Sequence, residues 1–290
     1  MGKFLPFTIA AVTPFTEQGD FDPKSVPGLI QYLVKEANAP GLLICGSTGE
    51  QHIMSIEDRL ELYSSVRNTV GTNYPLYAGV AAFTTKDAIR LAKGAEKDGY
   101  QAVMLGFPPY RIPTQKEAIE YVIDVCKAIP STLVFLYNNP KRTGFNLSVE
   151  SLVNIVNQVP NVEGLKQAGN RADVPLAILQ LSRKIQFLSG FDATIVEDFQ
   201  MGYSAITSIA GNIFPNQTAE LIHWIENGEK GNKIEERQTL IRDAITFVGE
   251  NGALPCLKYI LRKRGVSAGF CPPPLKDPST DLALSLDKYC

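Results

Sequence analysis

The sequence predicts an α/β fold, a (β/α)8 TIM barrel with a small C-terminal helical extension. Eight short apolar segments alternate with longer amphipathic ones over about 225 residues, the size expected of eight strand–helix units. Several strand segments, such as residues 133–137, are apolar on both faces, which is typical of parallel strands covered on both sides. A doubly wound sheet is the alternative, but it usually has fewer repeats and a glycine-rich phosphate loop. The sequence contains neither G-x-G-x-x-G nor G-x-x-x-x-G-K-[ST].

The elements follow in order along the chain. The expected strands are residues 7–12, 41–45, 75–80, 102–105, 132–137, 162–167, 185–189 and 205–210. The helices expected between them are residues 55–70, 84–97, 114–128, 147–157 and 216–227. Polar residues precede these helices, and Ser55-Ile-Glu-Asp resembles a capping box. Residues 1–228 are therefore assigned to a catalytic barrel.

The remaining chain is expected to form three more helices, at residues 231–249, 254–263 and 281–288. Cys271-Pro-Pro-Pro separates the last of them from the others. Residues 229–290 are too few for a separate enzyme domain. We therefore expect a C-terminal helical extension that packs on the barrel or on a neighbouring subunit.

Composition excludes several classes of protein. The formal net charge is -2 and there is no Lys/Arg stripe, so a nucleic-acid partner is not expected. The five cysteines are scattered without a C-x-x-C pair, which favours free thiols in a reducing compartment. With two histidines, a metal site built from histidines is not expected. No segment resembles a signal peptide or a membrane span, so the expected location is the cytoplasm.

In a (β/α)8 barrel, the active site lies at the carboxyl ends of the strands. Lys166 ends the sixth expected strand, and alternation places it on the same face as Gly164, which would leave room for a long side chain pointing into the barrel mouth. Burial there favours the neutral amine, which can attack a carbonyl group. For a lysine taken alone, a solvated position at a strand end is the commoner case.

Two neighbouring strand ends carry groups that suit the same chemistry. Tyr137 ends the fifth strand, where a phenol can transfer protons to a carbonyl or a carbinolamine, although a strand tyrosine is more often a core residue. Ser47-Thr48-Gly49 follows the second strand, and its backbone N–H groups and hydroxyls can bind an anion such as the carboxylate of a 2-oxo acid. An ordinary strand–helix turn is the alternative for this segment.

Together these segments resemble the dihydrodipicolinate synthase and N-acetylneuraminate lyase superfamily. The resemblance covers nearly the whole chain and rests on segments in the family's order: Ala11-Val-Thr-Pro-Phe15, Gly46-Ser-Thr-Gly-Glu50, Tyr137-Asn-x-Pro, Gly164-Leu-Lys166 and Ala205-Ile-Thr-Ser-Ile-Ala-Gly-Asn212. It implies a class I lyase that forms a Schiff base with pyruvate and needs no metal or cofactor.

The resemblance also implies roles for individual residues. Lys166 corresponds to the Schiff-base lysine, Tyr137 to the proton-relaying tyrosine and Ser47 to the relay hydroxyl, while Thr48 and Gly49 would hold the carboxylate of the oxo acid. Tyr110 matches the tyrosine that reaches into a neighbouring active site. A homo-oligomer, a dimer or a tetramer, is therefore expected.

The sequence is compatible with two kinds of second substrate or reaction. Arg142 matches the arginine with which the synthases bind the carboxylate of an acidic aldehyde such as aspartate semialdehyde, and it favours a synthase. Thr207, expected to line the pocket, is closer to some 2-keto-3-deoxy sugar-acid aldolases and dehydratases. The turn after Lys166 is one residue shorter than in the synthases, which weakens the synthase assignment. Phe83 and Pro109 stand where lysine-inhibited synthases carry an Asn and a Tyr, so lysine inhibition of that kind is not expected.

Two further classes of protein fit the sequence less well. A catalytically silent paralogue that binds oxo acids would not need an amine nucleophile, so Lys166, Tyr137 and Tyr110 argue against it. A metal-dependent class II aldolase needs a cluster of His, Asp and Glu ligands, which the sequence lacks.

Overall fold

The strands form a closed barrel. The computed structural model describes residues 4–290, and its eight parallel strands follow one another around the barrel in chain order. They are β1 (Phe7–Ala10), β2 (Leu42–Ile44), β3 (Leu76–Gly79), β4 (Ala102–Gly106), β5 (Leu133–Asn138), β6 (Val162–Gln167), β7 (Gln186–Ser189) and β8 (Ala205–Ser208). β8 closes the barrel by pairing with β1, with Phe7 opposite Ile206. The predicted (β/α)8 barrel is confirmed, and each strand end lies within two residues of its expected position.

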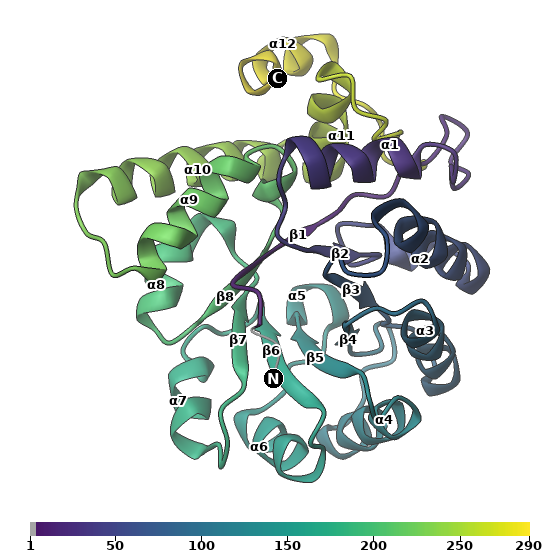
Figure 1. Ribbon diagram of the computed structural model, residues 1–290, viewed down its shortest axis with the longest axis vertical. Coiled ribbons are helices and arrows are strands. Elements are labelled where there is room, and N and C mark those ends of the chain that lie inside the picture. Colours follow the sequence, from purple (N-terminus) through teal and green to yellow (C-terminus); the bar gives the residue numbers. More distant parts are fainter. Residues whose placement is uncertain (1–3) are drawn as a thin grey trace.

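Helices surround the barrel (Figure 1). They are α1 (Val26–Gln31), α2 (Ile56–Val70), α3 (Thr85–Lys97), α4 (Gln115–Ala128), α6 (Val149–Gln158), α7 (Asp173–Gln180), α8 (Ile195–Gln200) and α9 (Pro215–Glu226). Ser55 caps α2 by accepting a hydrogen bond from the backbone N–H of Asp58 at 3.0 Å. The complete capping box is at α4, where Thr114 and Glu117 satisfy each other's backbone N–H groups.

Three of these helices were not expected from the sequence: α1, α7 and α8. The first is only six residues long and contains Gly28, which lowers helix propensity, while Pro27 and Pro175 lie in the first turns of α1 and α7, where proline is tolerated. Burial explains why α1 nevertheless forms, since its Val26 and Leu29 are almost completely buried against the barrel. Tertiary packing outweighs local propensity at these positions.

The apolar core has two parts. The smaller lies inside the barrel and includes Leu43, Tyr77, Met104 and Phe135. The larger lies between the strands and the surrounding helices and spans most of the chain. Phe135 stacks on Tyr77 with ring centroids 5.2 Å apart. The barrel interior is therefore filled by side chains, and the space for a ligand lies above this layer, at the carboxyl ends of the strands.

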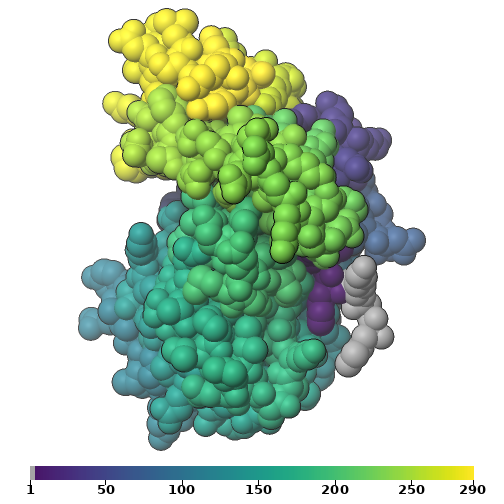
Figure 2. Space-filling model, turned by 90° about the vertical axis from the view of Figure 1, so that its left-hand side faces the viewer, coloured from purple at the N-terminus to yellow at the C-terminus, as the bar shows by residue number. Residues whose placement is uncertain are grey.

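The C-terminal helices form a layer at one end of the molecule. They are α10 (Asn232–Glu250), α11 (Ala253–Lys263) and α12 (Thr280–Leu286), and Figures 1 and 2 show them gathered beside the barrel on the side of α1. Phe270 pairs with Phe15 in an isolated antiparallel bridge, which ties this segment to the loop after β1. The boundary expected at residues 228 and 229 falls in the turn between α9 and α10 and stays a prediction. Within residues 4–290, no helix has the length and apolar character needed to span a bilayer.

Candidate active site

Lys166 and Tyr137 lie side by side at the barrel mouth. They are paired residues of adjacent strands, β6 and β5, so their side chains project from the same face. Lys166 is only 6 % exposed, and its Nζ lies 4.9 Å from the centre of the Tyr137 ring. Asn139 donates a hydrogen bond from Nδ2 to the Tyr137 hydroxyl at 2.7 Å. Because the phenol oxygen accepts this bond, its own O–H remains able to donate to a ligand.

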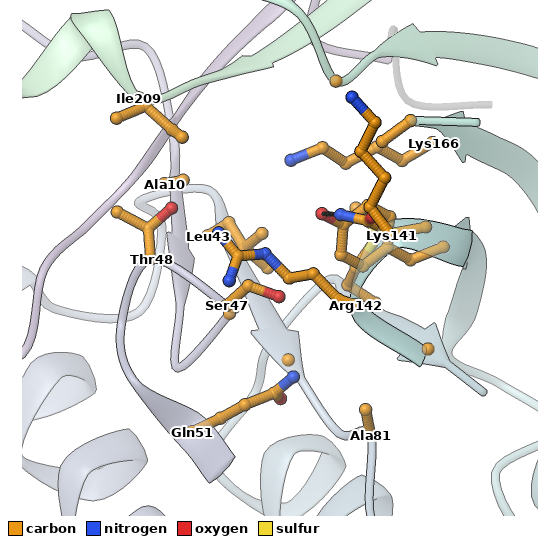
Figure 3. Close-up of a pocket in the computed structure, with 18 of the residues that line it drawn as sticks. Ala10, Leu43, Ser47, Thr48, Gln51, Ala81, Lys141, Arg142, Lys166 and Ile209 are labelled. Atoms are coloured by element: carbon orange, nitrogen blue, oxygen red, sulfur yellow. Dashed lines mark hydrogen bonds between the residues drawn. The ribbon is translucent and has the colours of Figure 1, made fainter. Parts of the chain in front are cut away.

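A cavity of about 290 Å³ opens above these two residues. Five of the eight predicted site residues line it together: Ser47, Thr48, Tyr137, Arg142 and Lys166. In Figure 3 the side chains of Lys166 and Arg142 extend across the cavity toward Ser47 and Thr48. An amine, a phenol, two hydroxyls and a guanidinium thus converge on one space of the size of a small organic acid.

The turn after β2 is held in a defined shape. Cys45 and Glu50, on either side of it, both have left-handed backbone conformations, with φ of 57° and 56°. The Thr13 hydroxyl donates to the Gly49 carbonyl oxygen at 2.8 Å, which fastens the turn to the segment after β1. A Cβ at Gly49 would lie 3.1 Å from the Cα of Cys45. Gly49 was expected to line the cavity. Instead, its lack of a side chain permits the turn to pack closely against Cys45.

Two other predicted residues lie outside the cavity. Thr207 is buried in β8, where its hydroxyl accepts a hydrogen bond from the Thr8 hydroxyl of β1 at 3.0 Å. It is therefore paired inside the barrel wall and is not among the residues that line the cavity. Tyr110 is 88 % exposed with a left-handed φ of 72°, and it does not line the cavity of its own chain either. Such an exposed aromatic side chain is available to a neighbouring molecule.

Arg142 stands on a short turn that also carries Lys141. The turn α5 (Pro140–Thr143) starts with proline, ends at Gly144 with a φ of 76°, and is closed by a hydrogen bond from the Arg142 N–H to the Asn139 carbonyl at 3.0 Å. Lys141 also lines the cavity, which the sequence analysis missed. None of the described residues that line this cavity is acidic, so three basic side chains face it without a carboxylate. Such a site attracts anions.

A buried amide network joins the loops that follow β5 and β6. Asn138, completely buried, donates from Nδ2 to the Gln167 side-chain oxygen at 2.9 Å and to that of Asn146 at 2.8 Å. Its own side-chain oxygen accepts from the backbone N–H of Leu147 at 2.9 Å. The network fixes Asn138 and Gln167, the residues that directly follow Tyr137 and Lys166. This gives the asparagine of the Tyr-Asn-x-Pro motif a structural role.

Asp192, another residue that the sequence analysis missed, is buried near Lys166. Its carboxylate accepts hydrogen bonds from the Ser208 hydroxyl and from the backbone N–H groups of Ile209, at 3.0 Å, and Ala210, at 3.3 Å. Burial raises the pKa of this carboxyl, while these hydrogen bonds and the positive charge of Lys166 lower it. Asp192 therefore shapes the loop after β8, whose Ile209 forms part of the cavity wall.

A second, outer cavity of about 670 Å³ adjoins the first and shares Ser47, Tyr137 and Arg142 with it. Phe83 and Pro109 line this outer space, where the sequence analysis placed them at the position of a lysine-binding site. Phe83 is 64 % exposed. The expectation that lysine does not inhibit in the usual way stays a prediction.

The remaining chemistry-bearing groups are few. All five cysteines have free thiols, as the sequence analysis expected. Across residues 4–290, no group of three or more His, Cys, Asp and Glu side chains is arranged to hold a metal ion.

Comparison with known proteins gives a consistent picture. The model of the dihydrodipicolinate synthetase family matches residues 3–289. The 4-hydroxy-tetrahydrodipicolinate synthase of Bacillus subtilis (strain 168) is 30% identical over 285 residues, which cover 98% of this chain and 97% of that protein. The synthase of Caldicellulosiruptor bescii is 30% identical over 89% of this chain and 91% of its own length.

Solved structures agree with these sequence relatives. A dihydrodipicolinate synthase from Bacillus anthracis superposes with a TM-score of 0.91 at 25% identity and covers 100% of this chain and 98% of that one. The N-acetylneuraminate lyase of Mycoplasma synoviae has a TM-score of 0.87 at 22% identity and covers 98% of this chain and 95% of that one. The second likeness concerns the fold alone.

Proposed function

Because the chain belongs to the dihydrodipicolinate synthetase family, we propose that it is a class I lyase that binds pyruvate as a Schiff base on Lys166. The observation that carries this proposal is the position of Lys166, a buried amine beside Tyr137 in a cavity that faces Ser47 and Thr48. Carboxylate binding at Ser47 and Thr48 would place the keto carbon of pyruvate toward Lys166.

The proposed chemistry starts with attack of the Lys166 amine on C2 of pyruvate. The carbinolamine loses water to give an iminium ion, and loss of a proton from C3 then gives an enamine. Tyr137, with a hydroxyl free to donate, is suited to move the protons of these steps, and Ser47 extends the relay. The enamine carbon attacks the carbonyl carbon of a second substrate, and water releases the product from Lys166.

For the second substrate we propose an acidic aldehyde such as aspartate semialdehyde, which makes the protein a 4-hydroxy-tetrahydrodipicolinate synthase. Arg142 supports this choice, since it lies in the cavity and a guanidinium suits bidentate binding of a carboxylate. A 2-keto-3-deoxy sugar acid stays the alternative, because Arg142 and Lys141 would bind a second carboxylate of such an acid equally well. The position of Thr207, away from the cavity, removes one of the arguments for the sugar-acid reaction.

A homo-oligomer is part of this proposal. Tyr110, Phe83 and Ile112 are large apolar side chains with exposed fractions of 88 %, 64 % and 61 %, and Leu179 of α7, on another side of the barrel, is 84 % exposed (Figure 1). Leu176 and Ile178 of α7, 51 % and 44 % exposed, extend this second apolar face, and two such faces favour a tetramer over a dimer. Five free thiols suit a reducing compartment, so we place the enzyme in the cytoplasm. Light scattering after size exclusion tests the oligomer, and a monomer active at high dilution would contradict the role of Tyr110.

The central test is borohydride reduction in the presence of pyruvate, followed by intact and peptide mass measurement. We expect one pyruvyl adduct per chain, on Lys166, and none in the variant Lys166→Ala. Lys141→Ala is the matched control, because Lys141 is the other lysine that lines the cavity, and its adduct should form on Lys166 as before. No adduct, or an adduct on another lysine, would refute the proposal. Coupled assays with aspartate semialdehyde and with keto-deoxy sugar acids then separate the two reactions.

A further inference from the structure

A buried ion pair joins the C-terminal extension to the cavity turn. Lys258 of α11 is completely buried and Glu50 is 1 % exposed, and the Lys258 ammonium donates a hydrogen bond to the Glu50 carboxylate. Lys258 also donates to the Phe270 carbonyl oxygen at 2.7 Å, and it lies 4.8 Å from the centre of the Phe15 ring. The two charges are thus enclosed by three distant parts of the chain.

Stability alone is a poor explanation for this pair. Burial lowers the pKa of Lys258 and raises the pKa of Glu50, while the charge of each partner opposes the shift of the other. Desolvation of two charges consumes most of their attraction, and apolar side chains of similar volume often stabilise a core equally well. Apart from Lys258, the only side-chain donor that the described residues offer the Glu50 carboxylate is the Cys271 thiol, a weak one, and the carboxylate oxygen Oε1 has no strong hydrogen-bond donor. The location of the ion pair in the structure indicates a role other than stability.

That position is the end of the turn that faces Lys166. Glu50 is the second residue after Thr48, and its backbone N–H donates to the Ser47 carbonyl oxygen at 3.2 Å. Its φ of 56° is unfavourable for a residue with a side chain, so the surrounding contacts must hold it there. Thr13 fastens the turn from the side of β1, and Lys258 fastens it from the C-terminal extension.

We propose that the pair of Glu50 and Lys258 is a positioning device, which holds Ser47 and Thr48 in the geometry that binds the carboxylate of the oxo acid. Neither residue touches the ligand, since neither lines the cavity. The C-terminal extension is thereby required for substrate binding. The ligand in this inference rests on the proposed function, whereas the restraint on the turn does not.

The experiment compares Lys258→Met, Glu50→Gln and the double variant. Both replacements are similar in length to the native side chain. The pyruvate concentration that gives half-maximal borohydride adduct should rise about tenfold or more in each single variant, because a displaced turn loses a hydrogen bond from Ser47 or Thr48 to the charged carboxylate. The adduct should remain on Lys166. In the double variant, which leaves no unpaired buried charge, stability should recover relative to the single variants while the pyruvate requirement stays high.

The control is Arg67→Met. Arg67 is also a buried cation, but it donates to the carbonyl oxygens of Gly71, Asp98 and Gly99, in the turns that follow α2 and α3 and lead into β3 and β4. The Arg67→Met variant should be less stable than the wild-type protein. Its pyruvate concentration for half-maximal adduct should equal that of the wild-type protein. A wild-type requirement in the Glu50 and Lys258 variants, or an equal rise in the Arg67 variant, would overturn the inference.

A second measurement separates this inference from the proposed function. Hydrogen exchange of the peptide that contains residues 45–54 should become faster in Lys258→Met without any ligand, and stay unchanged in Arg67→Met. Absence of a pyruvate adduct in the wild-type protein would refute the proposed function. Unchanged exchange of this peptide would refute the positioning role, whatever the ligand.

Discussion

Gly164→Ala should disturb both the barrel core and the site. Strand alternation predicted Gly164 beneath Lys166, as space for the lysine side chain. In the structure, its neighbour across the strand pair is Phe135 instead. A Cβ at Gly164 would lie 2.4 Å from Cδ1 of the Phe135 ring and 2.7 Å from the Gln186 carbonyl oxygen of β7. Glycine at this position therefore makes room for an aromatic ring from the adjacent strand.

The surroundings limit how this clash can be relieved. Phe135 is completely buried, stacked on Tyr77, and in edge contact with Phe4 at 5.9 Å between ring centroids. The Gln186 oxygen belongs to the backbone of the barrel. Overpacking of this kind costs about 1–3 kcal/mol, and we expect about 2 kcal/mol here. In a chain of 290 residues such a loss lowers Tm by roughly 3–4 °C.

The same change should also slow the chemistry. Relief of the clash requires β6 to shift, and Lys166 lies two residues further along the same face of that strand. A displacement of about 1 Å at a reacting atom can reduce a rate by up to about 10²-fold. We therefore expect slower pyruvate trapping together with lower stability. Thermal unfolding and the rate of borohydride adduct formation measure the two effects.

The control is Gly249→Ala, at the exposed end of α10, where a Cβ meets nothing within 4 Å. It should stabilise the protein slightly, by up to about 1 kcal/mol, because alanine favours helix over glycine. The double variant Gly164→Ala/Phe135→Leu should recover part of the loss, since a smaller side chain frees the space. Wild-type Tm in Gly164→Ala, or no recovery in the double variant, would refute this account of the barrel interior.

Two further predictions concern substrate selectivity and pH. Arg142→Ala should raise KM for an acidic aldehyde by about 10²-fold, because a bidentate contact to a charged group is lost, while the pyruvate adduct on Lys166 forms as before. Steady-state kinetics with each substrate varied measures this effect. Equal losses for both substrates would contradict the prediction. Burial raises the pKa of the thiols of Cys126 and Cys271 to about 12, from an ordinary value of 9.0. Between about pH 9 and 12 the unfolded chain therefore binds fewer protons than the native state, so the free energy of unfolding falls as pH rises through this window. Urea midpoints from pH 7 upward test the trend, which should be weaker in Cys126→Ala, and an unchanged midpoint above pH 9 would count against it.

The sequence was sufficient to predict the barrel and several strand ends that meet at one cavity. Apolar runs bounded by polar turns located all eight strands, because a parallel strand covered on both sides must be apolar on both faces. The rule that barrel sites lie at the carboxyl ends of strands selected Lys166, Tyr137 and the turn at Ser47 among a few candidates, and the family resemblance then favoured them. Those three segments do line one cavity.

Contacts between distant segments could not be predicted in this way. Gly164 accommodates Phe135 because the register between β5 and β6 places them opposite each other. The Thr207 hydroxyl accepts a hydrogen bond from Thr8 because β8 closes against β1. Neither partner can be identified from spacing along one strand. Lys141 and Arg142 are adjacent in a turn, and alternation rules that hold for strands do not decide whether both face the cavity.

The sequence by itself thus determined the periodic features of this protein, since the alternation of apolar and polar residues within one segment is a local property. Only the tertiary structure decided which buried groups meet. Glu50 and Lys258 are 208 residues apart, and each taken alone looks like a solvated surface charge. Their pairing exists because α11 packs beside the loop after β1, and a buried charge is tolerable only when the fold brings its partner to it.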